Sequence, residues 1–117
     1  MTNPLKGEVD VVLGGETYKA RLTVDALIGI ETSIGCGIIT LCNRIGQADI
    51  KISDVAIVLL AALRGGGNDL KQKDVYKIIQ ENGIVEVTTE VAKLITQSIN
   101  PKDETDDESE VDSKKKG

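Results

Sequence analysis

The chain has 117 residues, a formal net charge of −5 and only 2% aromatic residues, with two tyrosines and neither phenylalanine nor tryptophan. This length leaves room for one domain with one modest core, which must be built from aliphatic side chains. The basic residues are interleaved with acidic ones, which argues against a nucleic-acid partner, because phosphate binding requires clustered lysine and arginine.

The sequence also argues against attachment to a membrane. No stretch is long and apolar enough to span a bilayer. The opening residues, Met1 to Gly7, lack the apolar core of a signal peptide. We therefore expect a cytoplasmic location.

A glycine pair, Gly14-Gly15, predicts a two-residue turn that fixes the pairing of the strands on either side. Counting outward from the turn places Asp10 opposite Lys19 and Glu8 opposite Arg21, so one face of the hairpin carries two ion pairs. The other facing pairs are Val12 with Thr17, Val11 with Tyr18 and Val9 with Ala20. The second face is apolar and consists of Val9, Val11, Tyr18, Ala20 and Leu22. A slip of one residue would exchange the two faces, so the pattern predicts this register.

Two short helices are predicted after the hairpin. Thr23 can cap the first, which begins near Val24, and Gly35 ends it. Its apolar stripe, which includes one carboxylate, consists of Val24, Leu27, Ile28, Glu31 and Ile34. The apolar face of the second helix consists of Ile38, Leu41, Cys42 and Ile45, and Gly46 closes it.

The third predicted helix is expected to lie at the centre of the domain. Residues 49–52 alternate between charged and apolar side chains, which predicts either an extended connector or a brief strand. Ser53 then caps a third helix over 54–64, with Asp54 at the positive end of the helix dipole. This helix has no polar face, so we expect it to be buried on most sides. The run from Gly65 to Asp69 predicts a flexible loop.

Two further helices complete the predicted elements. The fourth runs over about 70–81, and Asn82-Gly83 stops it. Its inward side chains are Val75, Ile78 and Ile79. The fifth runs over about 85–99 and ends at Asn100-Pro101. Its inward side chains are Val87, Val91, Leu94, Ile95 and Ser98.

These elements predict an α+β fold. An N-terminal antiparallel β-hairpin (7–24) precedes a compact bundle of about five short helices (24–99), and together they form a single domain over residues 1–100. Residues 101–117 hold seven acidic residues against four lysines, with a single apolar residue, Val111. Such a composition predicts a disordered acidic tail.

No group of residues indicates catalysis or a bound cofactor. The chain has no histidine, the commonest general base, and without it a Cys–His metal site is excluded. Cys36 and Cys42 are interpreted as small core or boundary residues. Glu31 is interpreted as a boundary residue that caps or pairs near Arg21 or Lys19 of the hairpin. We therefore expect no catalytic residue, no metal and no cofactor.

Several segments together resemble a small family of tail proteins from tailed phages and phage-derived gene transfer agents, which is grouped with the tail assembly chaperones. The matching segments are Asn3-Pro4-Leu5-Lys6-Gly7-Glu8-Val9, Leu13-Gly14-Gly15-Glu16-Thr17-Tyr18, Arg21-Leu22-Thr23-Val24-Asp25-Ala26-Leu27, Glu31 followed by Gly35, and Ser53-Asp54-Val55 leading to Leu63-Arg64-Gly65-Gly66-Gly67. The resemblance runs over about residues 3–99. It leaves out the acidic tail, and the cysteine-containing second helix has no counterpart in it.

The resemblance implies a non-enzymatic factor in phage tail morphogenesis. The implied role is a tail assembly chaperone that binds the tape measure protein and assists polymerisation of the tail tube. Its implied partners are therefore the tape measure protein and the tail tube protein. The alternative is a structural tail tube or minor tail component of a phage or gene transfer agent particle. Self-association is left open.

Two surfaces are the candidates for contact with such partners, because both are expected to be exposed. The first is on the hairpin and comprises Val12, Thr17 and Tyr18. The second is the connection between the third and fourth helices and comprises Arg64, Gly65 and Gly66.

Overall fold

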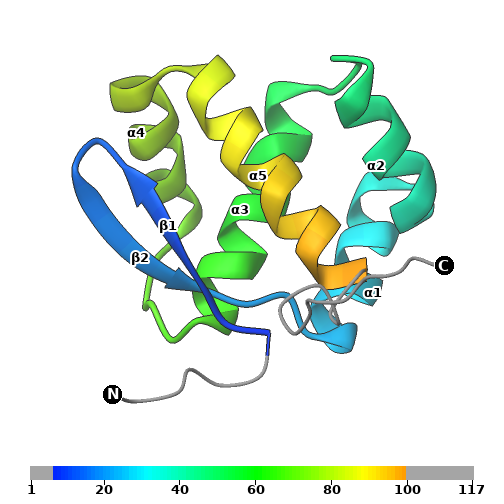
Figure 1. Ribbon diagram of the computed structural model, residues 1–117, viewed down its shortest axis with the longest axis horizontal. Coiled ribbons are helices and arrows are strands. Elements are labelled where there is room, and N and C mark those ends of the chain that lie inside the picture. The colour runs from blue at the N-terminus through cyan, green and yellow to red at the C-terminus, as the bar shows by residue number, and fades with distance from the viewer. Residues whose placement is uncertain (1–6, 100–117) are drawn as a thin grey trace, which may run out of the picture.

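The computed structural model describes residues 7–99, which form a two-stranded antiparallel sheet followed by five helices. The elements in chain order are β1 (Val9–Leu13), β2 (Glu16–Ala20), α1 (Val24–Ile34), α2 (Ile38–Gly46), α3 (Ile52–Gly65), α4 (Gln72–Asn82) and α5 (Ile84–Ile99). The hairpin lies at one side of the helical body, next to α4 and α5 (Figure 1). This is the predicted α+β architecture. The acidic segment 101–117, predicted to be a disordered tail, lies outside the described residues.

The register of the hairpin is the predicted one. Each strand residue pairs as expected, from Val9 with Ala20 to Val12 with Thr17. The Nζ atom of Lys19 lies 2.9 Å from an oxygen of Asp10. The predicted ion pair between Glu8 and Arg21 is wrong, since the described residues contain no such pair. Strand β2 ends at Ala20, and the main-chain N–H of Arg21 instead donates to the carbonyl oxygen of Ala62, at 2.8 Å.

Helix α1 has the predicted ends but a different buried face. The hydroxyl of Thr23 accepts a hydrogen bond from the N–H of Ala26 at 3.1 Å, and Gly35 ends the helix with φ of 91°. The predicted apolar stripe is wrong in part, because Val24 and Ile28 are 71% and 54% exposed. Ile30, which was outside that stripe, is the buried residue of α1. The helix packs on α3 through the side that carries Ile30.

The start of α2 depends on a side chain from α1. Gly37, the residue before the helix, has no side chain that could cap it. A carboxylate oxygen of Glu31 accepts a hydrogen bond from the N–H of Ile38 at 2.9 Å and takes this role. Glu31 does act as a cap, but the predicted place is wrong, because its partner is the first residue of α2 and neither Arg21 nor Lys19.

The start of α3 differs from the prediction. The helix begins at Ile52, so residues 49–52 form no strand and Ser53 is not the cap. The N–H groups of Asp54 and Val55 both donate to the carbonyl oxygen of Lys51, each at 3.0 Å, which closes the first turn earlier than expected. The helix also extends through Gly65, the first residue of the predicted loop.

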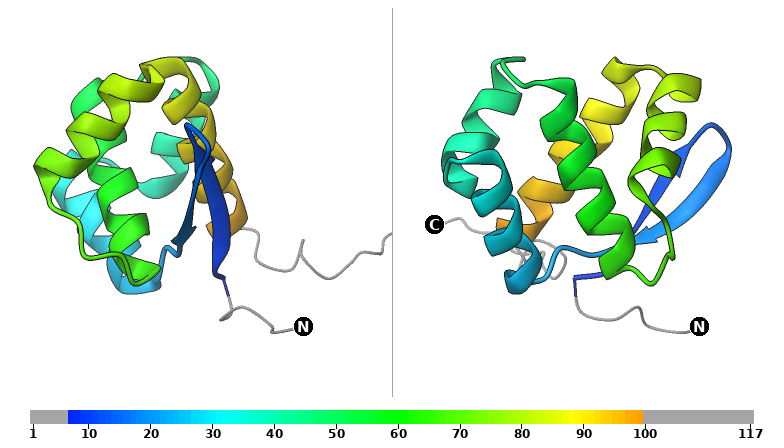
Figure 2. Two further views of the ribbon diagram at one scale, coloured as in Figure 1. Left: turned by 90° about the vertical axis from the view of Figure 1, so that its left-hand side faces the viewer. Right: turned by 180° about the vertical axis from the view of Figure 1, so that it is seen from behind.

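Helix α3 is the centre of the domain, as predicted. It packs against α1, α4, α5 and β2. Its buried residues are Asp54, Val55, Ala56, Val58, Leu59, Ala62 and Leu63. One strip of α3 stays half-buried and consists of Ile57, Leu60 and Ala61. Figure 2 shows in its right-hand view that α3 crosses the back of the molecule between α1 and α4.

Helices α4 and α5 pack against α3 with the predicted inward residues. Helix α4 begins at Gln72, two residues later than predicted, and the main-chain N–H of Lys71 donates to the carboxylate of Asp74 at 2.8 Å. The buried residues of the two helices are Val75, Ile78 and Ile79 of α4, and Val87, Val91, Leu94 and Ile95 of α5. Of the predicted set, Ser98 is only half-buried, and its hydroxyl donates to the carbonyl of Leu94.

Candidate functional site

Two of the candidate contact residues, Gly65 and Gly66, lie against strand β2. A side chain at Gly65 would overlap the carbonyl oxygen of Arg21, and one at Gly66 would overlap the carbonyl oxygen of Lys19. The side-chain amide of Asn68 donates to the same Lys19 oxygen at 2.6 Å. The expected flexible loop therefore lies directly against the hairpin, and the Asn68 side chain bonds it there. Close approach of two backbones explains the glycines without any partner.

The hairpin candidates lie on opposite faces. Val12 and Thr17 are facing residues on the outer face, and Val12 is 52% exposed. Tyr18 pairs with Val11 on the inner face and is half-buried. Burial raises the pKa of Tyr18, and the charges of Glu16 and Glu81 raise it further. A partner that covers Val12 and Thr17 would therefore not reach Tyr18 through the same face.

A groove lies between α1 and α3 and encloses 330 Å³. We call it the α1–α3 groove. Its lining residues are Ala26, Gly29, Ile30 and Ser33 from α1, and Ile57, Leu60, Ala61 and Arg64 from α3. One wall consists mostly of small residues and the other is the half-buried strip of α3. Arg64, the third candidate of the α3–α4 connection, lies at this groove, whereas Gly65 and Gly66 face the hairpin.

Sequence reasoning missed this groove, although one signal was available. A helix without a polar face has to be covered all round, and the stripe of Ile57, Leu60 and Arg64 recurs at intervals of three and four residues. Which neighbour covers that stripe depends on the packing of α1, and α1 is turned relative to the prediction. The sequence therefore indicates an apolar surface but does not locate it.

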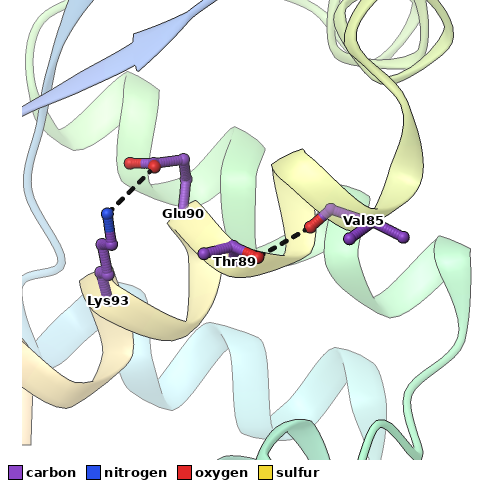
Figure 3. Close-up of polar contacts among 4 residues, drawn as sticks. All are labelled: Val85, Thr89, Glu90 and Lys93. Carbon is purple, nitrogen blue, oxygen red and sulfur yellow. Dashed lines mark hydrogen bonds and ion pairs between the residues drawn. The ribbon is translucent and has the colours of Figure 1, made fainter.

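A second hollow, of 420 Å³, lies between the end of α2 and the first half of α5. Its lining residues are Ile45, Ala48, Ile50, Ile84, Val85, Thr88, Thr89 and Ala92. Val85 is 77% exposed at this hollow, and the hydroxyl of Thr89 donates to the Val85 carbonyl at 2.9 Å (Figure 3). None of the described residues that line it is charged, so the hollow does not define the chemistry of a partner.

A third hollow, of 270 Å³, lies between β1 and α5 and has a lining of mixed polarity. Its walls are the outer edge of β1 and the side chains of Glu90, Lys93, Leu94 and Gln97. Lys93 and Glu90 form an ion pair at 3.3 Å across one turn of α5 (Figure 3). The two charged side chains that face this hollow from α5 are therefore paired with each other.

Residues 7–99 hold no obvious chemical centre. Within this range, no three histidine, cysteine, aspartate or glutamate side chains gather where they could hold a metal ion. Cys36 and Cys42 are free thiols and both are half-buried. No single helix among α1–α5 has the length and apolar character to cross a membrane, although α1 and α2, bent by 72° at their junction, meet those criteria as a pair.

The sequence of the whole described domain matches a known family. The family is described as phage tail tube protein, GTA-gp10, and its sequence model matches residues 6–100. The chain belongs to this family. Membership of the GTA-gp10 family makes it a tail protein of the phage and gene transfer agent type, as the resemblance implied. The description names a tail tube protein and does not name a chaperone. No curated protein and no solved structure matches the chain.

Proposed function

We propose that this chain is a non-enzymatic structural component of a phage-like tail, either of the tail tube itself or of the minor proteins attached to it. The observation that carries the proposal is the match of residues 6–100 to a family of tail tube proteins. It covers every element from β1 to α5, so the whole domain and not one motif supports it. Other tail proteins, including the tail tube protein, would be its partners.

The fold supports a position beside the tube wall more than a position within it. A wall made of continuous sheet needs several strands from each subunit, and residues 7–99 supply one hairpin of ten strand residues. This chain would therefore contact tube subunits through its exposed side chains, including Val12 and Thr17 on the outer face of the hairpin.

A tail assembly chaperone is the second candidate, and two observations favour it. The small sheet argues against a wall-forming subunit, and the α1–α3 groove is an apolar channel between two helices, a shape that suits a helix of a client protein. In this role the chain would bind the tape measure protein in the cytoplasm of the bacterial host while tube subunits polymerise around it. The family description fits the structural role better than this one.

Deletion of the gene in a producing strain tests the proposal. Particles from the deletion strain would be examined by electron microscopy, and wild-type particles would be analysed by mass spectrometry. Defective tails together with this chain in finished particles would support the structural role. Defective tails without the chain in finished particles would support the chaperone. Normal tails in the deletion strain would overturn both.

A further inference from the structure

We propose that the α1–α3 groove binds one amphipathic helix of a partner protein, with the apolar face of that helix on α3 and an acidic side chain at Arg64. The identification of the partner as a tail protein rests on the proposed function.

The first observation is the uncovered face of α3. Between its first and last turns the helix is buried on its other sides, whereas Ile57, Leu60 and Ala61 stay half-buried at the groove. Ile57, Leu60 and Arg64 lie on one face because they are three and four residues apart. Helix α3 itself runs across the back of the molecule between α1 and α4 (Figure 2). A partner with apolar side chains at the same spacing would complete the burial of α3.

The second observation is the glycine in the opposite wall. Gly29 lies in the middle of α1, where glycine costs about 0.5 to 1 kcal/mol relative to alanine. A Cβ atom at Gly29 would meet nothing within 4 Å, in contrast to Gly65 and Gly66. The fold of the single chain therefore does not need this glycine. Together with Ala26 and Ser33 it leaves a shallow wall, which allows the backbone of a second helix to come close.

The third observation is the charge at one end of the groove. Arg64 is the one charged residue among the described residues that line it. Its Nε atom donates to the carbonyl oxygen of Leu70 at 2.9 Å, which holds the guanidinium at the end of α3. The terminal nitrogens of Arg64 can then donate to a carboxylate, the group that matches a guanidinium best. The occupant should therefore carry glutamate or aspartate at this end of its apolar face.

The same charge argues against a second copy of the chain as the occupant. Two copies that met groove to groove would place the same lining residues on both sides of the contact. These include one positive side chain and no described acidic one, so Arg64 would be desolvated without a counter-charge.

Binding of two synthetic peptides to the full chain, labelled with ¹⁵N, tests the proposal. Both peptides are alanine-rich helices with leucines three and four residues apart, which matches the spacing of Ile57, Leu60 and Arg64. At the end of this leucine stripe one peptide carries glutamate and the other carries lysine. We expect the glutamate peptide to shift the NMR signals of Gly29, Ser33 and Ala61 and to bind about fivefold more tightly. The Arg64→Glu variant should reverse the preference. Equal binding of both peptides, or shifts confined to the hollow beside Val85, would overturn the proposal.

The Gly29→Leu variant separates an effect on peptide binding from an effect on the stability of the fold. Leucine has a higher helix propensity than glycine, so the variant should unfold at the same or a higher urea concentration. Its side chain would fill the groove, so the variant should bind the peptide at least about tenfold more weakly. Gly46→Leu is the matched control, since Gly46 lies at the end of α2 and has equal free space. Unchanged binding by Gly29→Leu would overturn the proposal. The proposal would also be overturned if the NMR signals of the peptide-free chain changed with protein concentration and those of Gly29→Leu did not. A second copy of the chain would then fill the groove.

The outcomes separate this inference from the proposed function. If tail proteins co-purify with both wild type and Gly29→Leu, the groove is not their contact and the tail function stands. If the wild-type chain binds the glutamate peptide but the deletion strain makes normal tails, the groove stands and the proposed function fails.

Discussion

The side-chain nitrogen of Asn68 lies 2.6 Å from the main-chain oxygen of Lys19, and this hydrogen bond joins the connection after α3 to strand β2. The same amide donates to the carbonyl of Leu63 at 2.9 Å, so one side chain ties the end of α3 to the hairpin. The N–H of Arg21 donates to the carbonyl of Ala62 beside it. A two-stranded hairpin is barely stable by itself, so these contacts, with the burial of Val11 and Ala20, hold it in place.

Replacing Gly66 by alanine should destabilise the domain. The backbone angles of Gly66 suit any residue, but the added methyl group would overlap the carbonyl oxygen of Lys19. We expect the free energy of unfolding to fall by about 1 to 3 kcal/mol, measured by urea denaturation. Gly29→Ala is the control, because a Cβ atom at Gly29 has free space. This substitution should raise the free energy of unfolding by about 0.5 to 1 kcal/mol. Equal effects of the two substitutions would contradict the close contact.

Replacing Glu31 by alanine should weaken the start of α2. The substitution removes the acceptor of the Ile38 N–H, and Gly37 offers no substitute. We expect a loss of about 0.5 to 2 kcal/mol in the free energy of unfolding. Glu31→Gln keeps an acceptor oxygen at the same place and should lose less. The account of this cap fails if the glutamine and alanine variants are equally destabilised.

Tyr18 should lose its proton at a higher pH than a free tyrosine. Its pKa in the folded chain is raised above 10.0, mainly by burial, so the folded state holds this proton more tightly than the unfolded state does. The free energy of unfolding should therefore fall as pH rises from about 10 through the raised pKa. The absorbance of tyrosinate in a Tyr76→Phe variant measures Tyr18 alone, because the chain has only two tyrosines. A midpoint at or below 10 would contradict the burial of this ring.

The outer face of the hairpin stays a predicted contact surface. Val12→Asp places a charge on an exposed side chain and should leave the free energy of unfolding within about 0.5 kcal/mol of wild type. If a tail protein covers this face, its affinity should drop about tenfold, because an unpaired charge would be desolvated in the interface. Val85→Asp is the matched control, since Val85 is an exposed valine on α5. An equal affinity for the Val12→Asp and wild-type chains would remove the hairpin from the contact surface.

The sequence predicts local features well because single residues determine them. The Gly14-Gly15 turn and the pairing of Asp10 with Lys19 determine the register of the hairpin, and Thr23 and Gly35 determine the ends of α1. In each case the cause lies within a few residues of the effect, as in a turn or a helix cap.

The features that the sequence does not predict depend on packing between elements. Helix α1 carries apolar residues around more than half of its circumference, so its spacing is compatible with burial of Val24 and Ile28 or of Ile30. Only contact with α3 selects the side that carries Ile30. The α1–α3 groove requires the same information. The glycines at 65 and 66 suggested a flexible, exposed loop, because nothing nearby in the sequence shows that β2 passes next to them.

Co-expression of this chain with the tail tube protein and the tape measure protein of the same particle tests the central claim most directly. The central claim is that the chain acts with other proteins of the tail. Size-exclusion chromatography with mass spectrometry would identify what elutes with it. We expect the chain to elute in a complex with at least one of the two proteins. Elution of this chain alone, with both tail proteins unchanged in solubility and size, would contradict it.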